Sequence, residues 1–74
     1  MAKTSEEDAV YKIVEVVGTS ATSWEQAASS AVATAAKTLH DLRIAEITKL
    51  DMRVEDGKVV AYRARVTLSF KYAP

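Results

Sequence analysis

The chain has 74 residues, in which ten lysines and arginines balance ten aspartates and glutamates, with one histidine and no cysteine. This length allows a single small domain, which buries only about 60% of the surface that its unfolded chain exposes. The lack of cysteine excludes disulfides and thiolate metal sites, and the zero net charge argues against nucleic acid as a partner. Association with other copies of the chain is therefore the stabilising factor that we expect.

Residues 1–8 (MAKTSEED) show no periodic apolar pattern, so we expect a flexible tail followed by one domain at 9–74. No apolar run approaches the roughly 20 residues that a membrane span needs. The polar, acidic start is also unlike a secretory signal. These features predict a cytoplasmic protein without a membrane partner.

A strand is predicted over 9–17 (AVYKIVEVV), which is rich in valine and isoleucine, and we expect Gly18 to end it. A helix should follow, because Thr22 and Ser23 suit an N-cap and each has a Glu or Gln three residues later. The alanine-rich run predicts a helix to about His40, where the imidazole would cap the helix dipole. Its apolar stripe comprises Trp24, Ala28, Ala31, Val32, Ala35 and Leu39.

Two long strands are predicted over 43–55 and 58–72, joined by Asp56-Gly57, a signal for a two-residue type I′ turn. The second strand alternates cleanly, so one of its faces should cover the helix. The apolar residues on that face are Val60, Tyr62, Ala64, Val66, Leu68, Phe70 and Tyr72.

The element order is β-α-β-β, which predicts an α+β fold with a three-stranded, largely antiparallel sheet and one helix on one face. A single helix leaves the other face open. The strand at 43–55 carries apolar residues of both parities, for example Leu50 and Ile47, so we expect both faces of the sheet to be partly buried. The open face is thus predicted to be a subunit interface.

The residues also resemble a known family, the dodecins. The resemblance is carried by Tyr11-Lys12 with Val14-Glu15, by Gly18-Thr19-Ser20, by the alanine-rich helix, by Ala45-Glu46-Ile47, and by Tyr62 leading into Val66 and Phe70. It covers about residues 10 to 72. Dodecins are small β-α-β-β proteins that assemble as hollow dodecamers, and most bind flavin dimers. The resemblance therefore implies a homododecamer in which the partner is the chain itself.

Three departures from the flavin-binding pattern imply that flavin stacking is lost. Where those dodecins have a stacking tryptophan, this chain has Ile44, and an aliphatic side chain cannot replace the indole. Arg63 stands where a glutamine bonds the flavin ring. Some members have a basic residue near the flavin phosphate in the region of Asp51. In this chain the charge there is negative and would repel a phosphate.

A branch of calcium-binding dodecins that lack flavin shares these departures. The chain resembles this branch in Thr22-Ser23-Trp24-Glu25-Gln26-Ala27-Ala28, Leu42-Arg43-Ile44-Ala45, Asp51-Met52 and Tyr62-Arg63. The resemblance implies calcium as the ligand. Calcium takes six to eight oxygen ligands. One chain cannot easily supply them, but symmetric copies can.

Asp51 is the first candidate ligand, followed by Glu46 and Glu15. Each has an alternative as an ion-pair partner: Asp51 of Arg53, Arg63 or Arg65, and the two glutamates of Arg43, Arg65 or Lys12. Arg63 and Arg65 could contact an anion or form ion pairs between subunits.

No catalytic constellation is visible, so we expect a binding protein and not an enzyme. The leading hypothesis is a dodecamer that binds calcium at subunit interfaces. The alternatives are a flavin-storage dodecin with a weakened pocket and a structural cage without a specific ligand.

Overall fold

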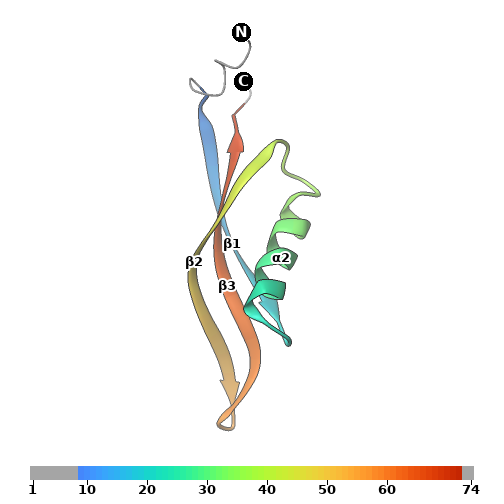
Figure 1. The fold of residues 1–74 in the computed structure, drawn as a ribbon, viewed down its shortest axis with the longest axis vertical. Coiled ribbons are helices and arrows are strands. Elements are labelled where there is room, and N and C mark those ends of the chain that lie inside the picture. Colours follow the sequence, from blue (N-terminus) through green and yellow to red (C-terminus); the bar gives the residue numbers. More distant parts are fainter. Residues whose placement is uncertain (1–8, 73–74) are drawn as a thin grey trace.

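The computed structural model describes residues 9–72 and contains four elements: β1 (Tyr11–Ser20), α2 (Trp24–Ala35), β2 (Leu42–Glu55) and β3 (Lys58–Lys71) (Figure 1). The strands form one antiparallel sheet in the order β1-β3-β2, so β3 is central and the other two strands are edges. The predicted α+β fold and its β-α-β-β order are confirmed. The tail predicted at 1–8 lies outside the described residues.

The helix begins as the sequence indicates, but Gly18 has a different role. The Ser23 hydroxyl caps α2 by accepting from the Gln26 N–H at 3.0 Å. Gly18 does not end β1, because the strand continues to Ser20 and Gly18 pairs with Ala64. A Cβ at Gly18 would lie 2.1 Å from the carbonyl oxygen of Ala27, so glycine is what lets the helix backbone approach the sheet.

The helix ends at Ala35, one turn earlier than predicted. The Ala35 carbonyl accepts from the Leu39 N–H at 2.9 Å and from the Thr38 hydroxyl at 3.4 Å, and the chain then reverses at Asp41, which has a φ of 57°. A threonine hydroxyl that competes for a helix carbonyl favours such an end. His40 therefore lies beyond the last helical turn, outside the range of the dipole, and its predicted capping role is wrong.

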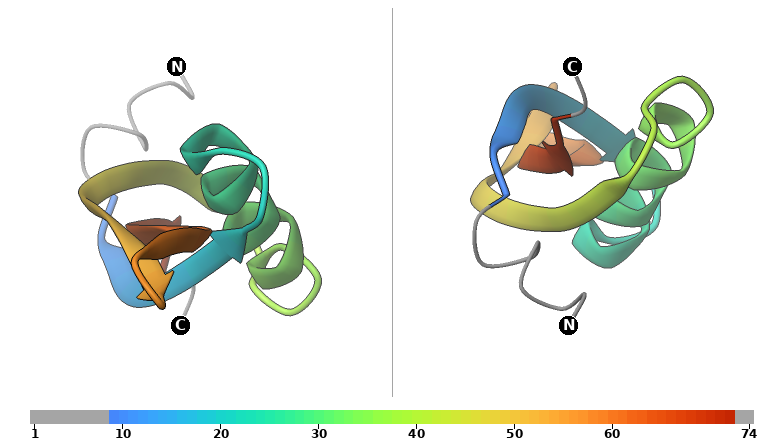
Figure 2. Two further views of the ribbon diagram at one scale, coloured as in Figure 1. Left: turned by 90° about the horizontal axis from the view of Figure 1, so that it is seen from below. Right: turned by 90° about the horizontal axis from the view of Figure 1, so that it is seen from above.

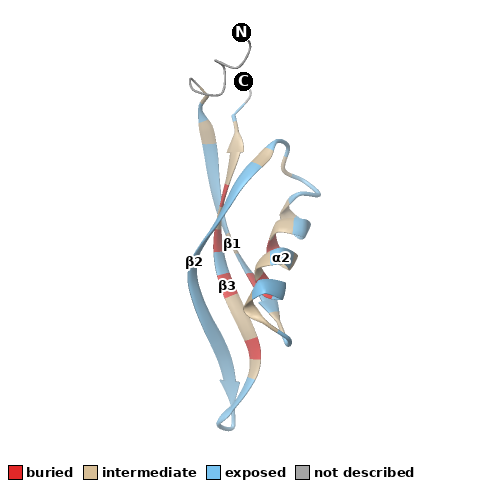
Figure 3. Cartoon of the chain, viewed as in Figure 1, coloured by how far each residue is buried: buried red, intermediate tan, exposed pale blue. Residues whose placement is uncertain are grey.

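The core lies between α2 and the sheet, over β1 and β3. Ala64, Val66 and Leu68 of β3 are buried, which confirms the helix-facing side predicted from their alternation. They pack against Ala27 and Ala31 of the helix. Figure 3 shows that β2, by contrast, is exposed almost from end to end, because the helix does not extend over it.

A β-bulge in β2 explains why its apolar residues have both parities. Ile47 pairs with Val66, whereas Lys49 pairs with Arg65, so Thr48 is an extra residue in the strand. Because an inserted residue reverses the alternation, Ile47 before the bulge and Leu50 after it point to the same side of the sheet. Ile44, which pairs with Ser69, lies on the opposite side from Ile47, so this strand does carry apolar residues on both faces. The burial of both faces by further copies of the chain stays a prediction.

We call the side that carries Val66 and the helix the inner face, and the opposite side the outer face. Ile47 and Leu50 remain about half exposed on the inner face, at 51% each. They border the uncovered part of the sheet, where a groove of about 340 Å³ lies between α2 and β2. This apolar strip is one of the exposed apolar surfaces of the described chain, beside Ile13 and Ile44, which are 63% and 55% exposed.

The hairpin of β2 and β3 extends well beyond the helix. Asp56 and Gly57 have φ values of 51° and 75°, as the predicted type I′ turn requires. The molecule measures 57 × 20 × 17 Å, and its radius of gyration of 15.3 Å exceeds the roughly 11 Å of a compact chain of this length. The sheet curls partly around the helix (Figure 2). Within residues 9–72, the helix is not long and apolar enough to cross a membrane.

Candidate functional site on the outer face

Three rows of side chains, set by the register of the strands, cross the outer face. One row contains Glu15, Thr67 and Glu46; the next contains Val17, Arg65 and Lys49; the third contains Thr19, Arg63 and Asp51. Neighbouring rows are two residues apart along β3, or about 7 Å. Carboxylates and cations thus alternate over a short stretch of the uncovered face.

Asp51 and Arg63 form the best-defined polar contact of this face. They lie directly opposite each other on β2 and β3. Arg63 Nε donates to Asp51 Oδ1 at 2.7 Å and Arg63 Nη2 donates to Oδ2 at 2.8 Å, which is the bidentate geometry that suits guanidinium and carboxylate. The sequence left Arg53, Arg63 and Arg65 open as partners of Asp51, and the cross-strand register selects Arg63.

The ion pair holds both groups in their charged forms. The hydrogen bonds from Arg63 lower the pKa of the Asp51 carboxyl below its usual value, partial desolvation opposes this, and the positive charges of Arg63, Arg65 and Lys49 add smaller lowering effects. The same hydrogen bonds raise the pKa of Arg63. Both side chains stay about half exposed, so solvent screens the pair and its contribution to stability is small.

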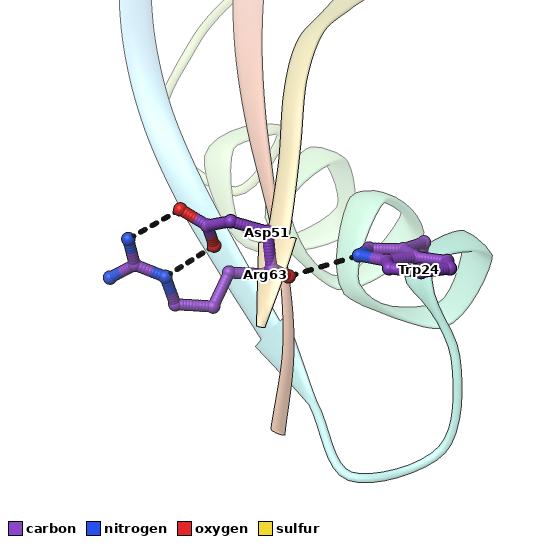
Figure 4. Close-up of polar contacts among 3 residues, drawn as sticks. All are labelled: Trp24, Asp51 and Arg63. Carbon is purple, nitrogen blue, oxygen red and sulfur yellow. Dashed lines mark hydrogen bonds and ion pairs between the residues drawn. The ribbon is translucent and has the colours of Figure 1, made fainter. Parts of the chain in front are cut away.

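Trp24 supports the same segment of β2 from the inner side. Its indole N–H donates to the backbone carbonyl of Asp51 at 3.0 Å, and its ring meets Tyr62 edge-on with 5.1 Å between centroids. Figure 4 shows the carboxylate of Asp51 and the guanidinium of Arg63 on the side away from Trp24. The first turn of the helix therefore fixes the backbone of Asp51 while its side chain remains on the outer face.

The three predicted carboxylates do not meet within one chain. Glu15 and Glu46 flank Thr67 in one row, with their Cα atoms about 10 Å apart across two strand spacings. Asp51 is in the row of Arg63, which lies four residues along β3 from Thr67, a distance of about 13 Å. Glu15 lies 3.9 Å from Arg65, one of the partners that the sequence offered. Among residues 9–72, no three acidic or histidine side chains come together closely enough to hold a metal ion.

The oxygen chemistry of these residues suits calcium, but the number of ligands in one chain does not. Asp51 offers two oxygens, and both already accept from Arg63. Calcium needs six to eight. A calcium shell built on this face requires carboxylates from further copies of the chain.

The two positions that match the flavin pocket are also far apart in one chain. Ile44 pairs with Ser69 and Arg63 pairs with Asp51, so about 20 Å of β3 separates them on the same face. Ile44 is 55% exposed. Any pocket that used both positions would need side chains from two chains.

Sequence reasoning missed Lys49 as a neighbour of Asp51. The signal was present, because residues two apart on a strand share a face, as Lys49 and Asp51 do. The position of Arg65 opposite Lys49, by contrast, follows only from the register of the strands. The hydrogen bond from Trp24 was missed as well, because the helical spacing places this tryptophan only in the apolar stripe of the helix. A polar N–H on a half-buried indole is the signal that could have indicated it.

Comparisons with known proteins agree with this fold. The dodecin family profile matches residues 10–73. Calcium dodecin of Mycobacterium tuberculosis is 43% identical over 65 residues, which cover 88% of this chain and 92% of that protein. The chain therefore belongs to the dodecin family.

Solved structures give the same result. Dodecin from Streptomyces coelicolor superposes with a TM-score of 0.85 at 34% identity, covering 90% of this chain and 96% of that one. The crystal structure of the calcium-chelating antigen calcium dodecin from M. tuberculosis, described as having a novel calcium-binding site, superposes with a TM-score of 0.78 at 45% identity. That match covers 89% of this chain and 94% of the other.

Proposed function

We propose that this chain assembles as a dodecin-type homododecamer that binds calcium where subunits meet, with Asp51 as the principal ligand and Glu46 and Glu15 as further ligands. The observation that carries the proposal is the similarity to a relative that chelates calcium. The proposed activity is binding and not catalysis. A cytoplasmic location is part of the same proposal.

Assembly is supported by the uncovered apolar strip of the inner face. Ile47, Leu50 and Met52 of β2 are each about half exposed although they point toward the helix side. Exposed apolar surface of this kind marks an interface, and burying it would supply stability that a single thin chain lacks. A second copy of the chain is the occupant that closed symmetry provides.

The assembly is tested by placing a charge in this strip. Ile47→Lys should shift the mass measured by light scattering from that of twelve chains toward smaller species, because a buried unpaired ammonium is costly. Ala36→Lys, at the exposed end of the helix, is the matched control and should leave the mass unchanged. An Ile47→Lys protein that remains dodecameric would remove this strip from the interface.

Calcium binding is supported by the position of Asp51 on an uncovered face and by its backing from Trp24. A carboxylate held at a fixed position on a rigid strand can be repeated around a symmetry axis to supply several oxygens. Because Trp24 bonds the backbone of Asp51, its fluorescence should report binding at this carboxylate.

The function is tested by calorimetric titration of the chelator-treated assembly with calcium, with Trp24 fluorescence as a second readout. Asp51→Asn should weaken binding at least about tenfold, since it removes a full ligand charge. Asp56→Asn is the control, because asparagine readily adopts the positive φ of this turn. The Asp56→Asn protein should bind calcium as the unaltered chain does. The proposal would be refuted if the unaltered chain gave no heat of calcium binding, or if the Asp51→Asn variant bound calcium with full affinity.

Flavin binding is measured on the same samples. Titrated flavin should keep its fluorescence, because Ile44 offers no ring for stacking. Strong quenching at micromolar flavin would instead favour the flavin-storage function. Binding of neither ligand would leave a structural cage.

A further inference from the structure

The oxygens that a cation needs at Asp51 are the oxygens that Arg63 already occupies. Both carboxylate oxygens accept hydrogen bonds from the guanidinium, at 2.7 and 2.8 Å. A calcium ion that chelates the carboxylate through both oxygens, at about 2.3–2.6 Å, needs the side of the group that the guanidinium occupies. The remaining lone pair on each oxygen permits only coordination through a single oxygen, beside the positive charge of Arg63. Chelation of a cation by both oxygens of Asp51 is therefore an exchange in which Arg63 leaves the carboxylate.

The surroundings of Asp51 add to this competition. Arg65 and Lys49 occupy the adjacent row of the outer face, and their charges act on the Asp51 carboxyl together with that of Arg63. One carboxylate thus faces three positive side chains. Glu15 lies 3.9 Å from Arg65 and offsets part of that charge. A divalent cation is repelled by each uncompensated neighbour, most strongly by the nearest.

We propose that Arg63 is an intramolecular competitor that sets the affinity of the Asp51 site for divalent cations. This inference rests on the proposed calcium function and adds its regulation. In the metal-free state the guanidinium neutralises Asp51. When the ion binds, Arg63 is released from the carboxylate and its side chain turns into solvent, which its exposure of 42% permits.

Arg53 provides a matched control on the same strand. It lies two residues from Asp51, but its guanidinium pairs with Glu55 and not with Asp51. Arg65 is the intermediate case, because its charge acts on Asp51 without a hydrogen bond. The inference therefore predicts an order of effects, with Arg63 first, Arg65 second and Arg53 without effect.

The experiment is a calcium titration of the assembled protein by calorimetry, comparing Arg63→Gln, Arg65→Gln and Arg53→Gln with the unaltered chain. Removing an exposed competing pair should tighten calcium binding up to about fivefold, and removing its charge should add to this. Arg63→Lys keeps the charge but loses the bidentate contact, so its affinity should lie between those of the unaltered chain and Arg63→Gln. Asp51→Asn combined with Arg63→Gln should abolish the gain.

The outcomes separate this inference from the proposed function. Equal or weaker calcium binding by Arg63→Gln, in a chain whose unaltered form binds calcium through Asp51, would overturn the inference and leave the function standing. If the unaltered chain and every variant bind no calcium, both fail. If Arg63→Gln does not assemble, the Arg63→Lys affinity decides, and a value equal to that of the unaltered chain overturns the competition.

Discussion

Replacing Gly18 by alanine would test how closely the helix lies against the sheet. The added Cβ would stand 2.1 Å from the carbonyl oxygen of Ala27 and 2.9 Å from the Cβ of Ala31. Ordinary contacts of this kind are about 3.5 Å, so the helix would have to move by about 1 Å or more. The nearest atom is backbone, and no side-chain rotation can relieve the clash.

The cost is worked from two opposing effects. Overpacking a tight core costs about 1–3 kcal/mol, and a clash with backbone belongs at the upper end of that range. The better strand propensity of alanine returns about 0.5–1 kcal/mol. We therefore expect a net loss of about 2 kcal/mol, which lowers the melting temperature by roughly 10 °C in a domain of this size.

The assay is thermal unfolding followed by circular dichroism at one fixed protein concentration, because association contributes to the apparent stability. Gly57→Ala serves as the control. It also removes a glycine, but nothing lies within 4 Å of its added Cβ, so only the cost of its φ of 75° remains, about 1 kcal/mol. A Gly18→Ala protein that melts at the temperature of the unaltered chain would refute the close approach of helix and strand.

Two further predictions concern the contacts around Asp51. Trp24→Phe removes the indole N–H that donates to the Asp51 carbonyl but keeps an aromatic edge for Tyr62. Unfolding in denaturant should therefore show a loss of about 1 kcal/mol in the free energy of unfolding. An unchanged midpoint would mean that this hydrogen bond adds nothing to stability. Carboxyl NMR should find the pKa of Asp51 below its usual value of 3.8 and should find it raised in Arg63→Gln. Because a lowered carboxyl pKa stabilises the folded state above the unfolded pKa, this contribution should be lost as pH falls below about 4 through the folded pKa; an Asp51 pKa that does not respond to Arg63 would contradict the pairing.

The local elements follow from the sequence itself. The Ser23 cap, the Asp56-Gly57 turn and the alternation of β3 each depend on residues close together in the chain, and each is confirmed. Short-range hydrogen bonds and backbone preferences decide such features, so they can be inferred without knowing the rest of the fold. The order of these elements then limits the architecture to a few arrangements.

The candidate site depends on contacts between strands. Asp51 has arginines within reach both along its own strand and across the sheet, and only the register places Arg63 opposite it. That register includes a bulge at Thr48, which moves the residues that follow it in β2 to the other face. In the sequence the bulge shows only as a change in the parity of the apolar residues, which does not tell a bulge from a strand with two apolar faces. The role of Gly18 is similar, since it depends on a helix backbone that packs against it from a separate element.

The chain thus determines by itself which segments become helix, strand and turn, because neighbouring residues settle those choices. The tertiary structure alone decides which face each side chain of β2 occupies, how closely the helix lies against the sheet, and which basic side chain pairs with Asp51. These outcomes depend on register and close packing between segments, which arise only when distant parts of the chain come together.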